Sequence, residues 1–306
     1  MISIEDYLKQ KYSPTVVSSN KLYIERYKLT LGQRSEKATY TEILDYIGQL
    51  RETVNSRTGR RLHPKTLRNH LFAIKIYHRY LIETGKRKDN PAEFIYLKDR
   101  IDRQIHLESL YPIETLEELY ETWQSRNPKH QSRDKIIISL LVYQALTVLE
   151  ITQLKISDIN LEEGTIKIRG NAKNKGRTLS LKPKQILLFH NYIKHDRKRY
   201  HRKQKPGTCT ERSRSKRTDY FLMNDEGLQL WSGGINRMIN SDRNSQNKLL
   251  PIKIRQSVIA HLIKENHDIR VVQEFAGHRR TASTESYKQS GLEELKSAIE
   301  KLHPLQ

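Results

Sequence analysis

The sequence predicts a mainly α-helical protein with a small antiparallel β-sheet, made of an N-terminal helical bundle and a larger α+β domain. Its 306 residues are enough for about two domains, each with a hydrophobic core. Apolar residues recur at helical spacing over most of the chain, whereas residues 164–181 alternate as a β-hairpin does. The expected parts are the bundle over residues 1–100, a linker over 101–111, the second domain over 112–290 and a helical tail over 291–306.

The charge balance is strongly positive, with 56 lysines and arginines against 35 aspartates and glutamates and a formal net charge of +21. Such a field attracts polyanions, and nucleic acid is the first candidate, although a solvated basic surface has the same composition. The lone cysteine, Cys209, excludes an internal disulfide and a cysteine-based zinc site, which is typical of a cytoplasmic protein. No stretch approaches the roughly 18 apolar residues of a membrane span. We expect a cytoplasmic, nucleoid-associated protein with no membrane partner and no small-molecule substrate.

Residues 1–100 are expected to form about four helices. Two pairs with capping spacing mark helix starts, namely Ser3 with Asp6 and Thr39 with Glu42. The clearest apolar stripe runs over residues 64–84, with a proline at its start and a glycine after its end.

The polar side of this 64–84 helix is basic. Lys65, Arg68 and Lys75 lie on it, where they could meet DNA phosphates. The ordinary alternative is that helices of a basic protein have basic outer faces. We expect all three side chains to contact DNA.

A β-hairpin is predicted in the middle of the chain. Two alternating segments within residues 164–181 flank a turn that is rich in glycine and lysine. The turn carries Lys173 and Lys175, and we expect Lys175 and Arg177 to contact DNA phosphates. A third short strand is expected at residues 220–223.

The last third of the chain carries residues suited to chemistry on a phosphodiester. Transfer through a covalent intermediate needs a nucleophile, donors for the non-bridging oxygens and an acid for the leaving oxygen. Tyr287 offers a nucleophilic hydroxyl, Arg255 a two-pronged guanidinium, and His278 a proton or a hydrogen bond. Each alone has an ordinary alternative, since most of the 16 tyrosines must be core or surface residues. No acidic cluster or metal-type histidine spacing accompanies them, so we expect no metal and no cofactor.

The order of these residues resembles the C-terminal signature of the tyrosine recombinase, or phage integrase, family. In that family R-x-x-x-(A/T)-x-H-L, L-G-H and a nucleophilic tyrosine recur in this order. The corresponding residues here are Arg255 with His261-Leu262, Gly277-His278 and Tyr287. The stretch L-T-V-L-E-I-T-Q-L-K-I-S-D-I at residues 146–159 is similar to the family's first conserved box.

The resemblance implies a site-specific recombinase that cleaves DNA and forms a 3′-phosphotyrosine on Tyr287, with Arg255 and His278 at the phosphate. It also implies that a hairpin lysine protonates the leaving 5′ oxygen. Turn length leaves the choice between Lys173 and Lys175 open, and Lys173 is preferred.

Two family positions lack the expected catalytic side chain. The first catalytic arginine corresponds to Thr147, which cannot carry a positive charge, and the accessory histidine corresponds to Ile252. Loss of one oxyanion donor typically lowers a rate by about 10² to 10³. The basic residues that could substitute are Arg169, Lys173, Arg177, Arg279 and Arg280.

We therefore expect an active but atypical recombinase that binds double-stranded DNA. The alternatives are a catalytically degenerate DNA-binding partner of other recombinases and, with less support, a type IB topoisomerase, which uses the same chemistry to relax supercoils. The resemblance further implies a homo-oligomer, dimer or tetramer, on DNA. In it the 291–306 helix packs on its own domain or is donated to an adjacent protomer.

Overall fold

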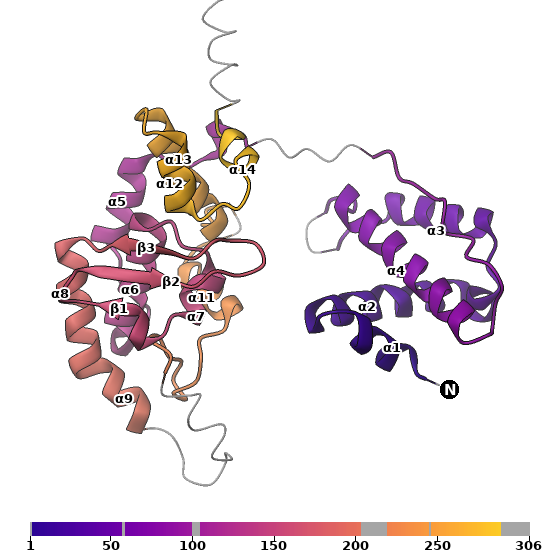
Figure 1. Cartoon of the computed structure of the whole chain (residues 1–306), viewed down its shortest axis with the longest axis horizontal. Helices are drawn as coiled ribbons and strands as arrows, with labels where there is room; N and C mark the ends of the chain where they lie inside the picture. The colour runs from indigo at the N-terminus through magenta and orange to yellow at the C-terminus, as the bar shows by residue number, and fades with distance from the viewer. Residues whose placement is uncertain (1, 57–58, 100–104, 203–218, 245, 289–306) are drawn as a thin grey trace, which may run out of the picture. The chain divides into compact units, whose positions relative to one another are not determined.

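The structure is a computed structural model that divides into two compact units, residues 1–103 and residues 104–306 (Figure 1). The residues that it describes are 2–56, 59–99, 105–202, 219–244 and 246–288. The predicted 291–306 helix lies outside the described residues, as does the start of the predicted linker.

The first unit is helical, as predicted. Its elements are α1 (Ile4–Lys11), α2 (Pro14–Leu31), the short 3-10 helix η1 (Gly32–Glu36), α3 (Tyr40–Glu52) and α4 (Pro64–Glu83). Both capping pairs are confirmed, because Ser3 accepts from the Asp6 N–H and Thr39 forms a capping box with Glu42.

The core of the first unit is rich in tyrosine and histidine. The Tyr27 hydroxyl lies 3.1 Å from Nε2 of His78, and the Tyr46 hydroxyl lies 3.3 Å from Nδ1 of His70. All four side chains are buried. Each pair satisfies polar groups that burial would otherwise penalise.

The second unit is built around α6 (Gln131–Tyr143), whose residues from Ile136 to Val142 are all buried. The other helices are α5 (Ile113–Glu121), α7 (Val148–Gln153), α8 (Pro183–Asn191), α9 (Arg197–Arg202), α11 (Ser232–Ile239), α12 (Pro251–Lys264), α13 (Ile269–Ala276) and α14 (Ala282–Glu285). Short 3-10 turns lie at Leu107–Ser109, Pro128–His130 and Ile156–Asp158, and a π-helical turn at Tyr192–Asp196 joins α8 to α9.

A three-stranded antiparallel sheet of order β1-β2-β3 lies against these helices (Figure 1). Its strands are β1 (Ile159–Asn160), β2 (Thr165–Ile168) and β3 (Arg177–Ser180). The predicted hairpin is confirmed as β2 and β3, with Ile168 opposite Arg177. The expected strand at 220–223 is wrong. Phe221, Leu222 and Met223 are buried one after another, and the bridges of Tyr220 and Met223 are isolated.

Candidate active site

Arg255 lies on α12 and ties together two other elements. Its Nη1 donates to the carbonyl of Ala145 and its Nη2 to the carbonyl of Ala276, both at 2.5 Å. Ala145 follows α6 in a left-handed conformation with φ of 48°. Only 4% of Arg255 is exposed, and this burial lowers its pKa while the charge of Glu150 opposes the change. The guanidinium is therefore a fixed, buried positive group.

A buried carboxylate, Glu150 on α7, contacts two arginines. Nη1 of Arg177 donates to its Oε1 at 2.7 Å, and Nη1 of Arg255 lies 3.8 Å from its Oε2. The side chains of Glu150 and Arg177 are each 1% exposed. Burial alone would raise the pKa of Glu150, but the hydrogen bond and charge of Arg177 hold that pKa below its ordinary value.

Thr147 has a structural role at the same carboxylate. Its Oγ1 accepts from the N–H of Glu150, and its own N–H and hydroxyl donate to Oε2 of Glu150. The residue at the first arginine position therefore begins α7 as the N-cap of a capping box.

His278 follows α13, which ends at Gly277 in a left-handed conformation with φ of 69°. Its Nδ1 lies 2.9 Å from Oγ1 of Thr284. Burial, followed by the charges of Arg255 and Arg177, lowers the pKa of His278 to about 4. The imidazole is therefore neutral at pH 7.

The hairpin turn is joined to this segment through its backbone. The N–H of Lys175 donates to the carbonyl of Gly277 at 2.8 Å, and Asn174 forms an isolated bridge with His278. The side-chain amide of Asn174 also donates to Oε1 of Glu150 at 3.2 Å. These contacts place the turn beside His278.

Tyr287 comes two residues after α14 and is 6% exposed. Its ring lies nearly parallel to the His278 ring, with 6.4 Å between the centroids and 14° between the planes. Burial raises the pKa of Tyr287 to about 12, against the opposing charge of Arg255. The hydroxyl is therefore protonated at neutral pH.

A surface pocket of about 560 Å³ brings three of the candidate residues together. Lys173, His278 and Tyr287 line it with Ala172, Asn174, Arg279, Arg280, Ser283 and Ser286. Lys175 is exposed on the same turn but is not part of this lining. Arg255 contacts the carbonyl of Ala276, two residues before His278, but is not itself part of the lining.

The expected DNA contact of Arg177 does not fit this geometry. On β3, buried and exposed residues alternate, and Arg177 shares the inward face with Leu179. Its guanidinium is paired with buried Glu150 and does not reach the surface. Recognising the alternation together with the T-x-x-E capping spacing from Thr147 would have placed these groups correctly.

The predicted DNA contacts of the first unit differ in exposure. Lys65 is exposed at the start of α4. Arg68 donates to the carbonyl of Asp99 at 2.5 Å, and Lys75 donates to the carbonyl of Glu93 at 2.8 Å. Arg68 and Lys75 thus hold the segment that follows α4, and their DNA contacts stay predictions.

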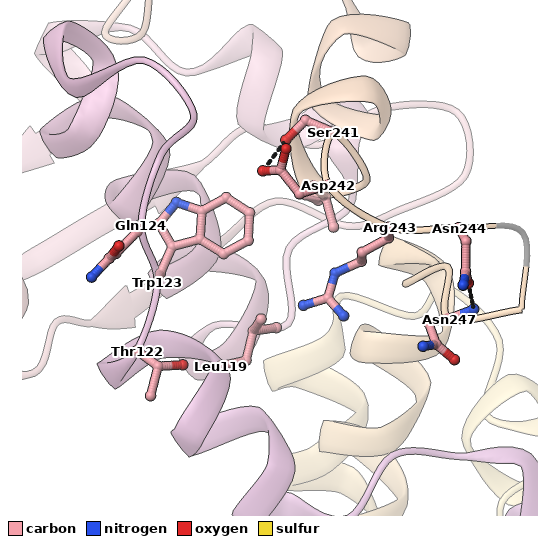
Figure 2. Close-up of a pocket in the computed structure, with 10 residues that line it drawn as sticks. Leu119, Thr122, Trp123, Gln124, Ser241, Asp242, Arg243, Asn244 and Asn247 are labelled. Carbon is pink, nitrogen blue, oxygen red and sulfur yellow. Dashed lines mark hydrogen bonds between the residues drawn. The ribbon is translucent and has the colours of Figure 1, made fainter.

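Other surface features of the second unit are separate from this site. Figure 2 shows a pocket of about 400 Å³ in which Trp123, just after α5, stands near Asp242 and Arg243. None of the candidate catalytic residues lines it.

Within the described ranges, no group of three or more His, Cys, Asp or Glu side chains could hold a metal ion. No helix in the described part of the chain is long and apolar enough to cross a membrane.

The fold and the match to a family model place the chain among DNA strand-transferring enzymes. The model of the phage integrase family matches residues 110–294, and the chain belongs to this family of tyrosine recombinases.

Two relatives illustrate the range of sequence similarity. Tyrosine recombinase XerA of Pyrococcus furiosus is 29% identical over 185 residues, which cover 58% of this chain and 58% of XerA. Tyrosine recombinase XerD of Staphylococcus haemolyticus is 23% identical over 309 residues, which cover 98% of each chain.

Solved structures show the same fold. The XerH site-specific recombinase bound to a palindromic difH substrate has a TM-score of 0.59 and 20% identity, over 93% of this chain and 78% of XerH. The Tn1549 transposon integrase in complex with transposon right end DNA has a TM-score of 0.58 and 16% identity, over 95% of this chain and 97% of the integrase chain. Both of these neighbours were solved with DNA.

Proposed function

We propose that this chain is an active site-specific recombinase that cleaves and rejoins double-stranded DNA through a 3′-phosphotyrosine on Tyr287. The observation that supports it best is the pocket lined by Tyr287, His278 and Lys173, close enough to buried Arg255 for its charge to act on Tyr287 and His278. A nucleophile, a hydrogen-bonding imidazole, an ammonium and a fixed cation are the groups that a phosphodiester transfer requires.

The reaction can be written with these groups alone. The Tyr287 oxygen attacks phosphorus, the bond to the 5′ oxygen breaks, and Lys173 gives its proton to that oxygen. When Nδ1–H of His278 donates to Thr284, Nε2 is an acceptor and takes the Tyr287 proton. Attack by another strand's 5′-hydroxyl reverses these steps, so joining needs no external energy source.

Arg255 is assigned to the non-bridging phosphate oxygens. A guanidinium carries several N–H donors, and its bonds to two carbonyls fix the orientation of the group. This fixed orientation favours a phosphate that enters the pocket in one pose.

A second candidate function is a DNA-binding partner that does not cleave. Thr147 and Ile252 favour it, because neither can donate to a phosphate oxygen as arginine or histidine does. Each loss would lower the rate by about 10² to 10³, which an enzyme acting once per recombination event tolerates.

The test is a nicked suicide substrate built on DNA that the purified protein selects from a random library. A covalent protein–DNA adduct is expected, and it must vanish in Tyr287→Phe. Tyr40→Phe, at an exposed tyrosine, is the matched control and should keep the adduct. Tight, specific binding without an adduct on any selected site would support the non-cleaving alternative and contradict our proposal.

The finer points of assembly are also proposals. We place the DNA contacts on Lys65, Arg68, Lys75 and Lys175, in a cytoplasmic, nucleoid-associated homo-oligomer. We further propose that residues 101–111 are a linker between the 1–100 bundle and a 112–290 catalytic domain, and that the 291–306 helix is exchanged between protomers.

Crosslinking on DNA should show dimers or tetramers of the full chain and monomers after truncation at Ser290. Equal crosslinking of both proteins would contradict the exchange.

A further inference from the structure

Thr147 carries no positive charge, but Arg177 on β3 brings one to the same buried carboxylate, Glu150. Glu150 lies three residues after Thr147, in the first turn of α7. It is buried, and its carboxylate contacts Arg177 of β3. Arg255 also approaches this carboxylate, at 3.8 Å. Three buried charges from α7, β3 and α12 thus meet near His278, on whose pKa all three act.

The net charge of this group decides how it acts on a phosphate. Glu150 and Arg255 alone would sum to zero, whereas Arg177 brings the total to +1. Buried charges interact more strongly than exposed ones because less water screens them. Arg177 therefore leaves uncompensated positive charge next to the position where the phosphate gains negative charge.

The surroundings of Arg177 are shaped to hold its guanidinium. A Cβ on Gly277 would lie 2.5 Å from Nη1 of Arg177, so only glycine leaves the space beside His278. Arg177 Nε is buried and has no hydrogen-bond partner among the described residues. Unpaired buried donors are uncommon in folded proteins.

Of the other basic candidates, Lys173, Arg279 and Arg280 line the surface pocket, and Arg169 and Arg279 have partners of their own. Arg169 is half exposed and pairs with Asp158 at 2.8 Å. Arg279 donates to the carbonyl of Asn171 at 2.7 Å and so fixes the hairpin turn. Neither contacts Glu150 or Arg255 in the described structure.

We propose that Arg177 replaces, from β3, the positive charge that Thr147 lacks, by neutralising Glu150 so that the charge of Arg255 acts on the scissile phosphate. This inference rests on the proposed function. Arg177 is a positioning residue here, because it acts through Glu150 and Arg255 and does not touch the DNA.

The first experiment removes the positive charge of Arg177 and then introduces a positive charge at position 147, where the family has its first arginine. Arg177→Met should lower the rate of adduct formation on the nicked substrate by about 10² to 10³. Adding Thr147→Arg to this variant should recover at least about tenfold, because an arginine one turn before Glu150 can meet the same carboxylate. A thermal melt of each variant separates loss of folding from loss of rate.

A second variant keeps the test valid if Arg177→Met does not fold. Arg177→Met combined with Glu150→Gln removes both buried partners and leaves Arg255 with its full +1. The rate should again exceed that of Arg177→Met alone. Arg133→Met is the matched control, since Arg133 also pairs with a buried acid, Asp134, at 2.9 Å. It should lower the melting temperature without a change in rate per folded molecule.

A measurement on DNA-free protein separates this inference from the proposed function. The groups that act on the His278 titration are Arg255, Arg177 and Glu150. By NMR, the pKa of His278 should rise in Arg177→Met and stay near the wild-type value in Arg133→Met. An unchanged His278 pKa, or a folded Arg177→Met that cleaves within about threefold of wild type, overturns the role of Arg177. Absence of any wild-type adduct contradicts only the proposed function.

Discussion

Two buried histidines, His70 and His78, should make the first unit sensitive to acid. They are 2% and 0% exposed, and burial lowers the pKa of each to about 4. The charge of Arg26 lowers the pKa of His70 further, and that of Arg87 does the same for His78. Within the described residues, Nδ1 of His78 has no partner that could stabilise an added proton.

The sign and size of the effect follow from linkage. An unfolded histidine has a pKa of about 6.5, so between pH 6.5 and 4 the unfolded chain binds protons that the folded chain excludes. Stability is therefore complete above about pH 6.5 and is lost as the pH falls toward 4. A difference of about 2.5 in pKa corresponds to about 3 kcal/mol per histidine, of which about 2 kcal/mol is lost by pH 5. The two histidines together should reduce the free energy of unfolding by about 4 kcal/mol between pH 7.5 and pH 5.

Hydrogen–deuterium exchange of the full chain measures this loss locally, in peptides from α4. The double variant His78→Phe with Tyr27→Phe removes one titrating group together with the hydroxyl that it contacts at 3.1 Å. The acid-induced loss should then fall by about half. Equal opening free energies of α4 at both pH values, or an undiminished loss in the double variant, would refute the reasoning.

Three further predictions concern the second unit. Ala145→Gly should relieve the left-handed backbone at φ 48° and stabilise by about 0.5–1 kcal/mol, a rise of about 1–4 °C in a thermal melt. Lys173→Ala should slow adduct formation by about 10² to 10⁴. A substrate with sulfur at the 5′ leaving position should restore that rate, and Lys175→Ala should show neither effect. Glu150→Gln should lower the free energy of unfolding in urea by about 3–5 kcal/mol, because Arg177 is left buried without a counter-charge.

Local signals predicted the secondary structure well. Thr39 with Glu42 and the proline at position 64 mark helix starts through contacts within one turn, which a sequence shows directly. The hairpin followed from alternation of residue type. The prediction of a strand at 220–223 failed because Phe221, Leu222 and Met223 are all buried and do not alternate, and Phe221 packs against the rings of Phe189 and Tyr192.

The sequence suggested the residues of the candidate site but not the contacts between them. Arg255 bonds to carbonyls that lie 110 and 21 positions away in the chain, and backbone acceptors leave no mark in a sequence. Arg177 was expected on the DNA side because basic residues near a turn are usually exposed. Its burial depends on a single counter-charge, Glu150, from another element.

Thr147 and Ile252, the two departures from the family pattern, leave fewer groups to accept the Tyr287 proton and to stabilise charge on the phosphate. In the DNA-free protein the pKa of Tyr287 is about 12 and that of His278 about 4, a gap of 12 − 4, or about 8. Burial therefore opposes transfer of the proton from Tyr287 to His278 before attack. With isoleucine at position 252, the described pocket lining offers no second imidazole to share this step. In the proposed reaction we therefore expect the proton to leave Tyr287 as the bond to phosphorus forms, when the negative charge passes to the phosphate oxygens. The proposed mechanism assigns the stabilisation of that charge to Arg255, so we expect the charge of Arg177 to matter more here than in a recombinase with an arginine at the position of Thr147.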